Sequence, residues 1–184
     1  METYTTVIPL GFKAPEFQLP DTITGNILSL NQLKSDKATV LMFICNHCPF
    51  VQHVVNELVR LANDYLPKEV SFIGISSNDI IAYPQDSPKE MKKFAELHKF
   101  SFPYLYDETQ EVAKAYHAAC TPDFSIFDKD LLCVYRGRMD GSRPGNNIEV
   151  DGREIRSALD NILKGEPVSS QQLQSVGCNI KWKS

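Results

Sequence analysis

The chain has 184 residues, of which 42% are hydrophobic and 23% are charged, and its formal net charge is −4. A small negative charge without a Lys/Arg block excludes the electrostatics of nucleic-acid binding and of attachment to an anionic membrane. The length suits one well-cored domain over residues 1–184. No stretch approaches the roughly 20 apolar residues of a membrane span, and the first residues lack a signal-peptide pattern, so we expect a cytoplasmic protein. Five cysteines, an odd number, favour reduced or catalytic thiols over a disulfide framework.

Residues 1–37 are predicted to be an N-terminal hairpin extension. Residues 16–19 alternate between polar and apolar, residues 21–26 supply turn residues, and residues 27–30 return as a second strand.

The stretch that organises the chain is residues 38–51, ATVLMFICNHCPFV. The apolar run from Ala38 to Ile44 is typical of a strand buried on both faces. From Val51 onward the apolar residues follow the spacing of one helical face. Cys45 and Cys48 therefore sit between a buried strand and the first turn of a helix, which indicates a redox site rather than a zinc ribbon.

The start of a helix is a favourable place for a thiolate. Unpaired N–H groups and the positive end of the helix dipole stabilise an anion there. Asn46 and His47 separate the two cysteines, and a protonated His47 would lower the pKa of a neighbouring thiol further. Such stabilisation of the reduced form would make the disulfide a stronger oxidant.

Further elements are predicted along the rest of the chain. They are a buried parallel strand at residues 70–75, a helix opening with a capping box at residues 87–90, a short helix at residues 109–117, a hairpin of residues 124–128 and 131–136, a last helix with apolar positions at residues 155–163, and a tail at residues 165–184. Because the carboxyl ends of parallel strands share one edge, the loop from Asn78 to Ser87 is expected beside Cys45.

The hairpin is preceded by Thr121-Pro122, and a proline at such a corner can be cis. The order of elements resembles the thioredoxin fold, an α/β fold with a central mixed sheet flanked by helices. That order is a strand, a Cys-x-x-Cys, a helix, then Thr-Pro before a hairpin and a final helix. The resemblance implies that the proline is cis and that Thr121 and Pro122 flank the two cysteines and hold the substrate chain.

More of the sequence resembles the alkyl hydroperoxide reductase/thiol-specific antioxidant (peroxiredoxin) branch, and within it a peroxiredoxin-like subfamily with a Cys-x-x-Cys. The stretches that carry the resemblance are Ala14-Pro15-Glu16-Phe17, Tyr83-Pro84, Asp86-Ser87, residues 104–107, residues 119–124, residues 135–138, residues 142–145 and residues 177–183.

The sequence departs from the peroxiredoxin pattern Pro-x-x-x-Thr-x-x-Cys-Pro. Aligned on Cys48-Pro49, the threonine position holds Cys45 and the first proline position holds Leu41. The position of the distant arginine falls at Pro122. The elements that activate peroxide in that family are thus replaced by a thioredoxin-like set, although Asn-His stands between the cysteines in place of Gly-Pro.

The end of the hairpin is expected at the same sheet edge as the cysteines, which brings Arg138, Asp140 and Arg143 toward them. These arginines could form a rim that favours thiolate or binds an acidic partner. A solvated loop with local ion pairs is the alternative.

Three cysteines remain outside the motif. Cys120 could be a third thiol near the redox pair or a small buried residue. Cys133 is predicted to be core. Cys178 could resolve an oxidised active-site cysteine, or its tail could dock as a strap. An alternative class of function is a copper- or zinc-binding protein of the same fold, with ligands Cys45, Cys48, His53 and Cys120.

We interpret the chain as a thiol-disulfide oxidoreductase without a bound cofactor, in which Cys45 attacks a protein or small-molecule disulfide and Cys48 resolves the mixed disulfide. A thioredoxin or glutathione system would reduce it. The alternative within the same class is a peroxiredoxin-like peroxidase with antioxidant activity. The sequence makes no statement about the oligomeric state.

Overall fold

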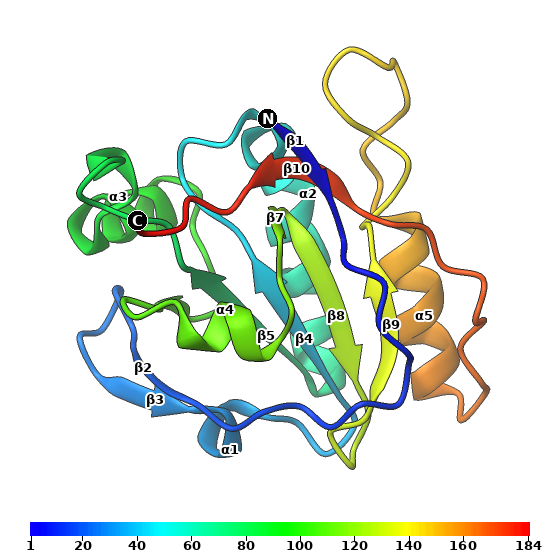
Figure 1. The fold of residues 1–184 in the computed structure, drawn as a ribbon. Helices are drawn as coiled ribbons and strands as arrows, with labels where there is room; N and C mark the ends of the chain where they lie inside the picture. The colour runs from blue at the N-terminus through cyan, green and yellow to red at the C-terminus, as the bar shows by residue number, and fades with distance from the viewer.

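In the computed structural model, which describes residues 1–184, a five-stranded mixed sheet with the order β6-β5-β4-β8-β9 lies at the centre (Figure 1). Strands β4, β5 and β6 are parallel, whereas β8 and β9 form an antiparallel hairpin beside β4. The strands are β4 (Ala38–Phe43), β5 (Val70–Ser76), β6 (Tyr104–Tyr106), β8 (Asp123–Phe127) and β9 (Cys133–Gly137). The predicted central strands and hairpin are confirmed, while β6 is too short to show a period in the sequence.

Strand β4 is buried along its whole length, as its unbroken apolar run predicts. Val40 and Met42 belong to a core cluster with residues of α2, α3 and α5, whereas Leu41 and Phe43 belong to a second cluster on the other face. Alternate side chains of one strand thus join two cores, as the pleat requires.

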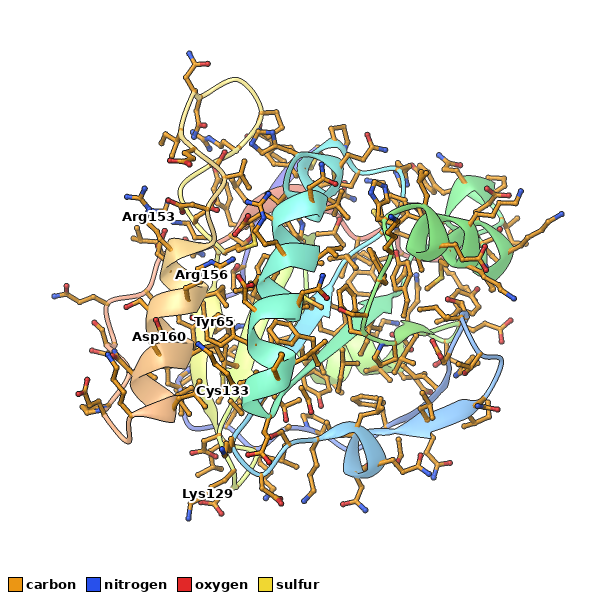
Figure 2. All side chains as sticks on the ribbon, turned by 180° about the vertical axis from the view of Figure 1, so that it is seen from behind. Tyr65, Lys129, Cys133, Arg153, Arg156 and Asp160 are labelled. Carbon is orange, nitrogen blue, oxygen red and sulfur yellow. The ribbon has the colours of Figure 1, made fainter.

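The two faces of the sheet are covered by different elements. The helices are α1 (Leu30–Leu33), α2 (Pro49–Tyr65), α3 (Pro88–Leu97), α4 (Glu111–Ala115) and α5 (Arg153–Leu163), with short 3-10 turns at Leu66–Lys68 and Pro84–Asp86. Helices α2 and α5 lie side by side on one face (Figure 2), where the Tyr65 hydroxyl donates to the Asp160 carboxylate at 2.6 Å. Helix α4 and the N-terminal segment cover the opposite face (Figure 1). No helix combines the length and the apolar character that a bilayer crossing requires.

Two local predictions are confirmed in detail. The N-terminal hairpin consists of β2 (Gln18–Pro20) and β3 (Ile27–Ser29), which pair in antiparallel fashion. The Ser87 side chain accepts a hydrogen bond from the Glu90 N–H and caps α3, whose first residue is Pro88. The predicted helix at residues 109–117 is shorter in the structure, where α4 spans five residues.

A second, three-stranded sheet was not predicted, and it involves both ends of the chain. Strand β10 (Val176–Asn179) lies between β1 (Glu2–Tyr4) and β7 (Cys120–Thr121), antiparallel to both. The C-terminal tail therefore crosses the top of the molecule above the start of α2 (Figure 1). This sheet places residues from both termini over the Cys-x-x-Cys.

Candidate active site

The two motif cysteines lie where the sequence predicts them. Strand β4 ends at Phe43 and α2 begins at Pro49, with Cys48 as the N-cap residue of the helix. The sulfurs are closed off from solvent, because Cys45 is 1% exposed and Cys48 is 0% exposed. A pair of thiols at a helix N-terminus is thus present, but it is covered.

Thr121 contacts both thiols. Its hydroxyl lies 3.5 Å from the Cys45 Sγ and its carbonyl oxygen 3.4 Å from the Cys48 Sγ. The Thr121-Pro122 peptide bond is cis, as the resemblance to the thioredoxin fold implied. The expected role of holding a substrate chain needs correction, however, because the backbone of Thr121 already pairs with Cys178 of β10.

The surroundings of Cys48 stabilise a thiolate. In its protonated state the Cys48 thiol donates to the Thr121 carbonyl oxygen. For the thiolate, the Cys45 thiol donates a hydrogen bond, the Cys178 Sγ lies 2.8 Å away, and the Val51 N–H and the Thr121 side chain contribute as well. These contacts outweigh burial and lower the pKa of Cys48 to about 5. Cys48 is therefore the anionic member of the pair at neutral pH.

Cys45 has the opposite environment. The pKa of Cys45 lies well above its ordinary value. It is raised by the hydrogen bond that the thiol donates to Cys48, by burial, and by the negative charge of Asp86. The sequence assigns attack to Cys45 and resolution to Cys48, whereas these two environments favour the opposite assignment. The sequence could not show this, because the deciding groups lie on distant segments.

His47 also differs from its predicted role. Its Nδ1 pairs with the carboxylate of the fully buried Asp86, and its ring stacks on Tyr83 with centroids 5.4 Å apart. No hydrogen bond joins His47 to either sulfur. The His47 ring thus pairs with Asp86, while one of its nitrogens lies within 4.8 Å of the Cys45 Sγ.

Asp86 is the centre of a buried network. It accepts hydrogen bonds from the backbone N–H of Asn46 at 2.9 Å and of His47 at 3.3 Å, and from the Asn78 side chain at 2.9 Å. The Asn46 side chain in turn accepts from the Tyr104 hydroxyl at 2.9 Å. The expectation that the loop from residue 78 to residue 87 lies beside Cys45 is confirmed. Asp86 itself was missed, and its position in that loop was the available signal.

The alternative metal site is not assembled as proposed. The predicted ligands were Cys45, Cys48, His53 and Cys120. His53 instead hydrogen-bonds through Nε2 to the Ser142 Oγ at 2.7 Å on the exposed side of α2. Cys120 is buried, and its Sγ has the carbonyl oxygen of Pro122 as its hydrogen-bonding neighbour at 4.0 Å.

A different group could offer ligands to a metal ion. One ligand atom from each of Cys45, His47 and Asp86 lies within 4.8 Å of the others. Thiolate, imidazole and carboxylate are a set that zinc accepts. The direct contact of His47 with Asp86 and the high pKa of Cys45 make this a hydrogen-bonded cluster in the protein as it stands.

The other free thiols differ in access. Burial raises the pKa of Cys120 well above its ordinary range, and that of Cys133 to about 12, in agreement with the core position predicted for Cys133. Cys178 is partly exposed, and its pKa is raised to about 12 by burial and by donation to Cys48.

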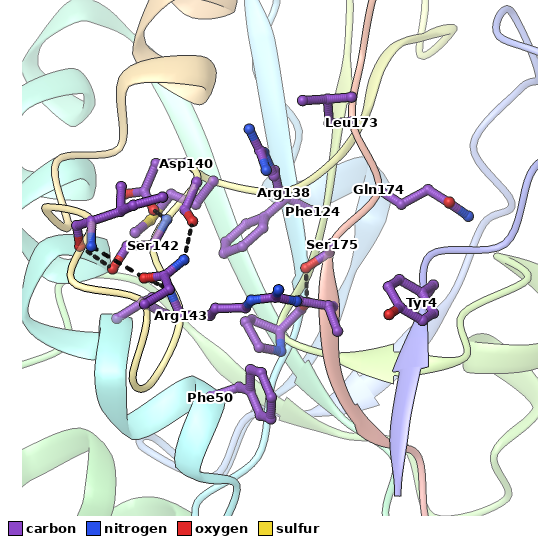
Figure 3. Close-up of a pocket in the computed structure, with 17 residues that line it drawn as sticks. Tyr4, Phe50, Phe124, Arg138, Asp140, Ser142, Arg143, Leu173, Gln174 and Ser175 are labelled. Atoms are coloured by element: carbon purple, nitrogen blue, oxygen red, sulfur yellow. Dashed lines mark hydrogen bonds between the residues drawn. The ribbon is translucent and has the colours of Figure 1, made fainter.

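The predicted arginine rim lines a pocket of about 390 Å³ beside Pro122 (Figure 3). Arg138 faces this pocket while its Nε donates to both carboxylate oxygens of Glu154 at 3.0 Å. Arg143 is exposed and has no acidic partner. Asp140 serves the loop itself, since it accepts from the backbone of Ser142 at 2.8 Å. Arg138 thus makes the local ion pair of the alternative interpretation, while a role of the rim toward a thiolate or an acidic partner stays a prediction.

The strand order, the cis-proline loop and the dithiol at the start of α2 define a thioredoxin-fold protein of the peroxiredoxin-like type. The sequence model of the AhpC/TSA family matches residues 10–136, so the chain belongs to the AhpC/TSA family.

Three proteins place the chain more closely. A solved structure of an uncharacterized conserved protein from Geobacillus kaustophilus is 62% identical, with a TM-score of 0.98, and the match covers 100% of this chain and 97% of that one. A protein of Mycobacterium tuberculosis named "putative peroxiredoxin" is 28% identical over 116 residues, which are 63% of this chain and 68% of the relative. The thioredoxin domain of a thiol-disulfide oxidoreductase from Bacteroides vulgatus shares the fold, with a TM-score of 0.62 at 19% identity over 82% of this chain and 98% of that one.

Family and fold together indicate a thiol redox activity of the oxidoreductase or peroxidase type.

Proposed function

We propose that the protein is a thiol-disulfide oxidoreductase in which Cys48 is the nucleophile and Cys45 the resolving thiol. The observation that carries this proposal is the position of the Cys48 sulfur at the N-terminus of α2, 2.8 Å from the Cys178 sulfur, in surroundings that lower its pKa. A thiolate attacks a disulfide sulfur through a mixed disulfide, and the attacking thiol works best when its pKa is near the ambient pH.

The reaction proceeds in two exchanges. The Cys48 thiolate attacks one sulfur of the substrate disulfide, forms a mixed disulfide and releases the other half as a thiolate. Cys45 then loses its proton, attacks the Cys48 sulfur and releases the second half, which leaves the Cys45–Cys48 disulfide. The two electrons of the dithiol have passed to the substrate, and a thioredoxin or glutathione system restores the dithiol.

Burial of both sulfurs restricts the substrate. A disulfide can reach Cys48 only if it is small or if the covering strand moves, because neither sulfur is open to solvent. Low-molecular-weight disulfides are therefore the first substrates to test, with protein disulfides as the second class.

Peroxide reduction is the second candidate, since Cys48-Pro49 occupies the position of the peroxide-attacking cysteine of the family. The main influences on the Cys48 sulfur are thiols, a backbone N–H and Thr121, and none of them is cationic. A guanidinium that polarises peroxide is missing from this set, so we expect peroxide to react at the rate of an ordinary low-pKa thiol.

The test measures initial rates with 2-hydroxyethyl disulfide and with hydrogen peroxide on the same fully reduced sample. We expect saturable disulfide turnover in the presence of a glutathione system and slow, non-saturable peroxide consumption. Cys48→Ser should abolish disulfide turnover, whereas Cys133→Ser, which removes a buried thiol elsewhere, should preserve it. Rapid, saturable peroxide turnover with negligible disulfide exchange would replace this proposal with the peroxidase.

A further inference from the structure

The C-terminal strand β10 brings a third thiol to the dithiol. The Cys178 Sγ lies 2.8 Å from the Cys48 Sγ, so Cys48 is in hydrogen-bond contact with Cys178 as well as with Cys45. The position of Cys178 is fixed by backbone pairing on both sides, to Glu2 of β1 and to Thr121 of β7. The contact of the two sulfurs is therefore built into a sheet and is not a chance approach of a loose tail.

Gly177 makes this approach possible. A Cβ at residue 177 would lie 1.9 Å from the carbonyl oxygen and 2.6 Å from the carbonyl carbon of Thr121. Those atoms are backbone of the loop with the cis-proline and cannot rotate away. Any larger residue at position 177 would push β10 off β7 and carry Cys178 away from Cys48.

The three sulfurs differ in their access to solvent. Cys45 and Cys48 are closed off, whereas Cys178 is partly exposed. A protein reductant that docks on the surface therefore meets Cys178 before it meets either member of the buried pair.

We propose that Cys178 is a third redox thiol, which exchanges with the Cys45–Cys48 disulfide and transfers the oxidation to the surface as a Cys48–Cys178 disulfide. This inference rests on the proposed function and names the point at which the reductant acts.

The exchange balances without a further oxidant. Cys178 loses its proton and attacks the Cys48 sulfur, the bond to Cys45 breaks, and the Cys45 thiolate takes up a proton. An external dithiol then attacks the sulfur of Cys178, the partly exposed residue of the pair, and expels the Cys48 thiolate. The second thiol of the reductant finally releases Cys178 and leaves as a disulfide, having supplied two electrons. Cys48 is suited to be the group expelled, because a thiol of lower pKa leaves faster.

The first experiment maps disulfides in oxidised protein. Trypsin leaves Cys45 and Cys48 on one peptide between Lys37 and Arg60 and Cys178 on another, so a bond to Cys178 joins two peptides. In Cys45→Ser treated with diamide and then alkylated, we expect the linked pair Cys48–Cys178 as the main product. A Cys48 that instead remains free, or that links to a second molecule, would overturn the proposal.

Gly177→Ala tests whether the position of Cys178, and not only its presence, is required for the Cys48–Cys178 disulfide. This substitution removes no cysteine, and we expect the Cys48–Cys178 link to disappear when it is made in the Cys45→Ser background. Cys133→Ser is the matched control and should leave the link intact. Circular dichroism on each variant establishes that the fold is retained, and an undiminished link in folded Gly177→Ala would contradict the role given to β10.

The second experiment follows reduction of the oxidised protein by reduced thioredoxin and by dithiothreitol. We expect Cys178→Ser to slow reduction by the protein dithiol by on the order of tenfold or more, since its buried disulfide must be reached directly, and to slow dithiothreitol less. Equal rates for wild type and Cys178→Ser would overturn the role of Cys178 while leaving the Cys45–Cys48 pair in place. Failure to form any Cys45–Cys48 disulfide would instead refute the proposed function.

Discussion

The surroundings of the two buried cysteines differ in charge and in hydrogen-bonding groups. On the side of Cys48 lie the start of α2 and the Cys178 thiol of β10. On the side of Cys45 lies the carboxylate of Asp86 with the groups that hold it. Donors on one side and a negative charge on the other place the thiolate on Cys48, although both cysteines stand in the same short motif.

The comparison shows that the segments packed against a Cys-x-x-Cys decide which of its two cysteines is the thiolate. Helix dipole and spacing favour a thiolate at either cysteine of the motif. The asymmetry comes from segments remote in sequence, namely the loop that carries Asp86 and the tail that carries Cys178.

The largest effect is expected from substitution of the two motif cysteines themselves. Cys48→Ser should remove the thiol that titrates near pH 5, so that thiolate absorbance at 240 nm develops only at alkaline pH. Cys45→Ala removes one donor to Cys48, which should then titrate at a higher pH than in wild type and still below the other thiols. If Cys45→Ala abolishes the low titration and Cys48→Ser retains it, the order predicted from the sequence is right and the structural assignment is wrong.

The second effect concerns Asp123, which accepts a hydrogen bond from the residue that follows β1. Asp123 is fully buried and accepts a hydrogen bond from Thr5 at 2.8 Å, and burial raises its pKa to about 6. The folded state therefore binds this proton more tightly than the unfolded chain, whose aspartates titrate near pH 4. Asp123 therefore stabilises the fold at pH values below about 4. As the pH rises toward 6 this contribution is lost, and the free energy of unfolding falls by about 3 kcal/mol.

Urea unfolding at several pH values measures this loss. Asp123→Asn keeps the shape without the titration, so its curve should lack the fall between pH 4 and pH 6 that wild type shows. Parallel curves for the two proteins would show that Asp123 carries no pH dependence.

A third, smaller effect tests the contact between β1 and the tail. The Thr5 hydroxyl donates to Asp123 and accepts from the Ser175 N–H at 2.9 Å. Thr5→Val should lower the free energy of unfolding by about 1–3 kcal/mol, since two buried partners lose a hydrogen bond. Thr3→Val, two residues away and without a side-chain hydrogen bond, is the control and should change stability little. Comparable losses in both variants would mean that shape, not hydrogen bonding, anchors the strand.

The smallest effect is expected on the Cys45 side. His47→Phe keeps a ring to stack on Tyr83 and removes the pairing with Asp86. Because His47 touches neither sulfur, the reduction potential of the pair should change by less than about 30 mV, which corresponds to about 1.4 kcal/mol. Equilibration with glutathione measures the potential. A shift of about 60 mV toward a more reducing pair would restore the direct stabilisation of thiolate that the sequence suggested.

The parts of the site that could be predicted are those with local signals. A buried strand, a Cys-x-x-Cys and a helical period adjoin one another in residues 38–66, and Thr121-Pro122 precedes a readable hairpin. Strand β10 could not be predicted, because Val-Gly-Cys-Asn has no alternation and its partners lie more than fifty residues away or at the other terminus. The role of Gly177 is a close approach to Thr121, which no pattern in a single sequence reports.

The same limit applies to His47 and Cys45, whose surroundings in the structure differ from those that the sequence suggested. His47 stands next to both cysteines in sequence, but a charge on a distant loop turns its ring toward Asp86. Cys45 precedes Cys48 in the motif, yet the order of the chain carries no information on which sulfur receives more hydrogen bonds.

The separation of 130 residues between Cys48 and Cys178 also has a consequence for biosynthesis. Strands β4 and β5 and helix α2, which carry and support the dithiol, are translated long before residues 176–179. Domains generally begin to fold from the N-terminal side during synthesis. In a nascent chain Cys45 and Cys48 are thus open to the surrounding thiols and oxidants until residues 176–179 have been translated and β10 can close over them.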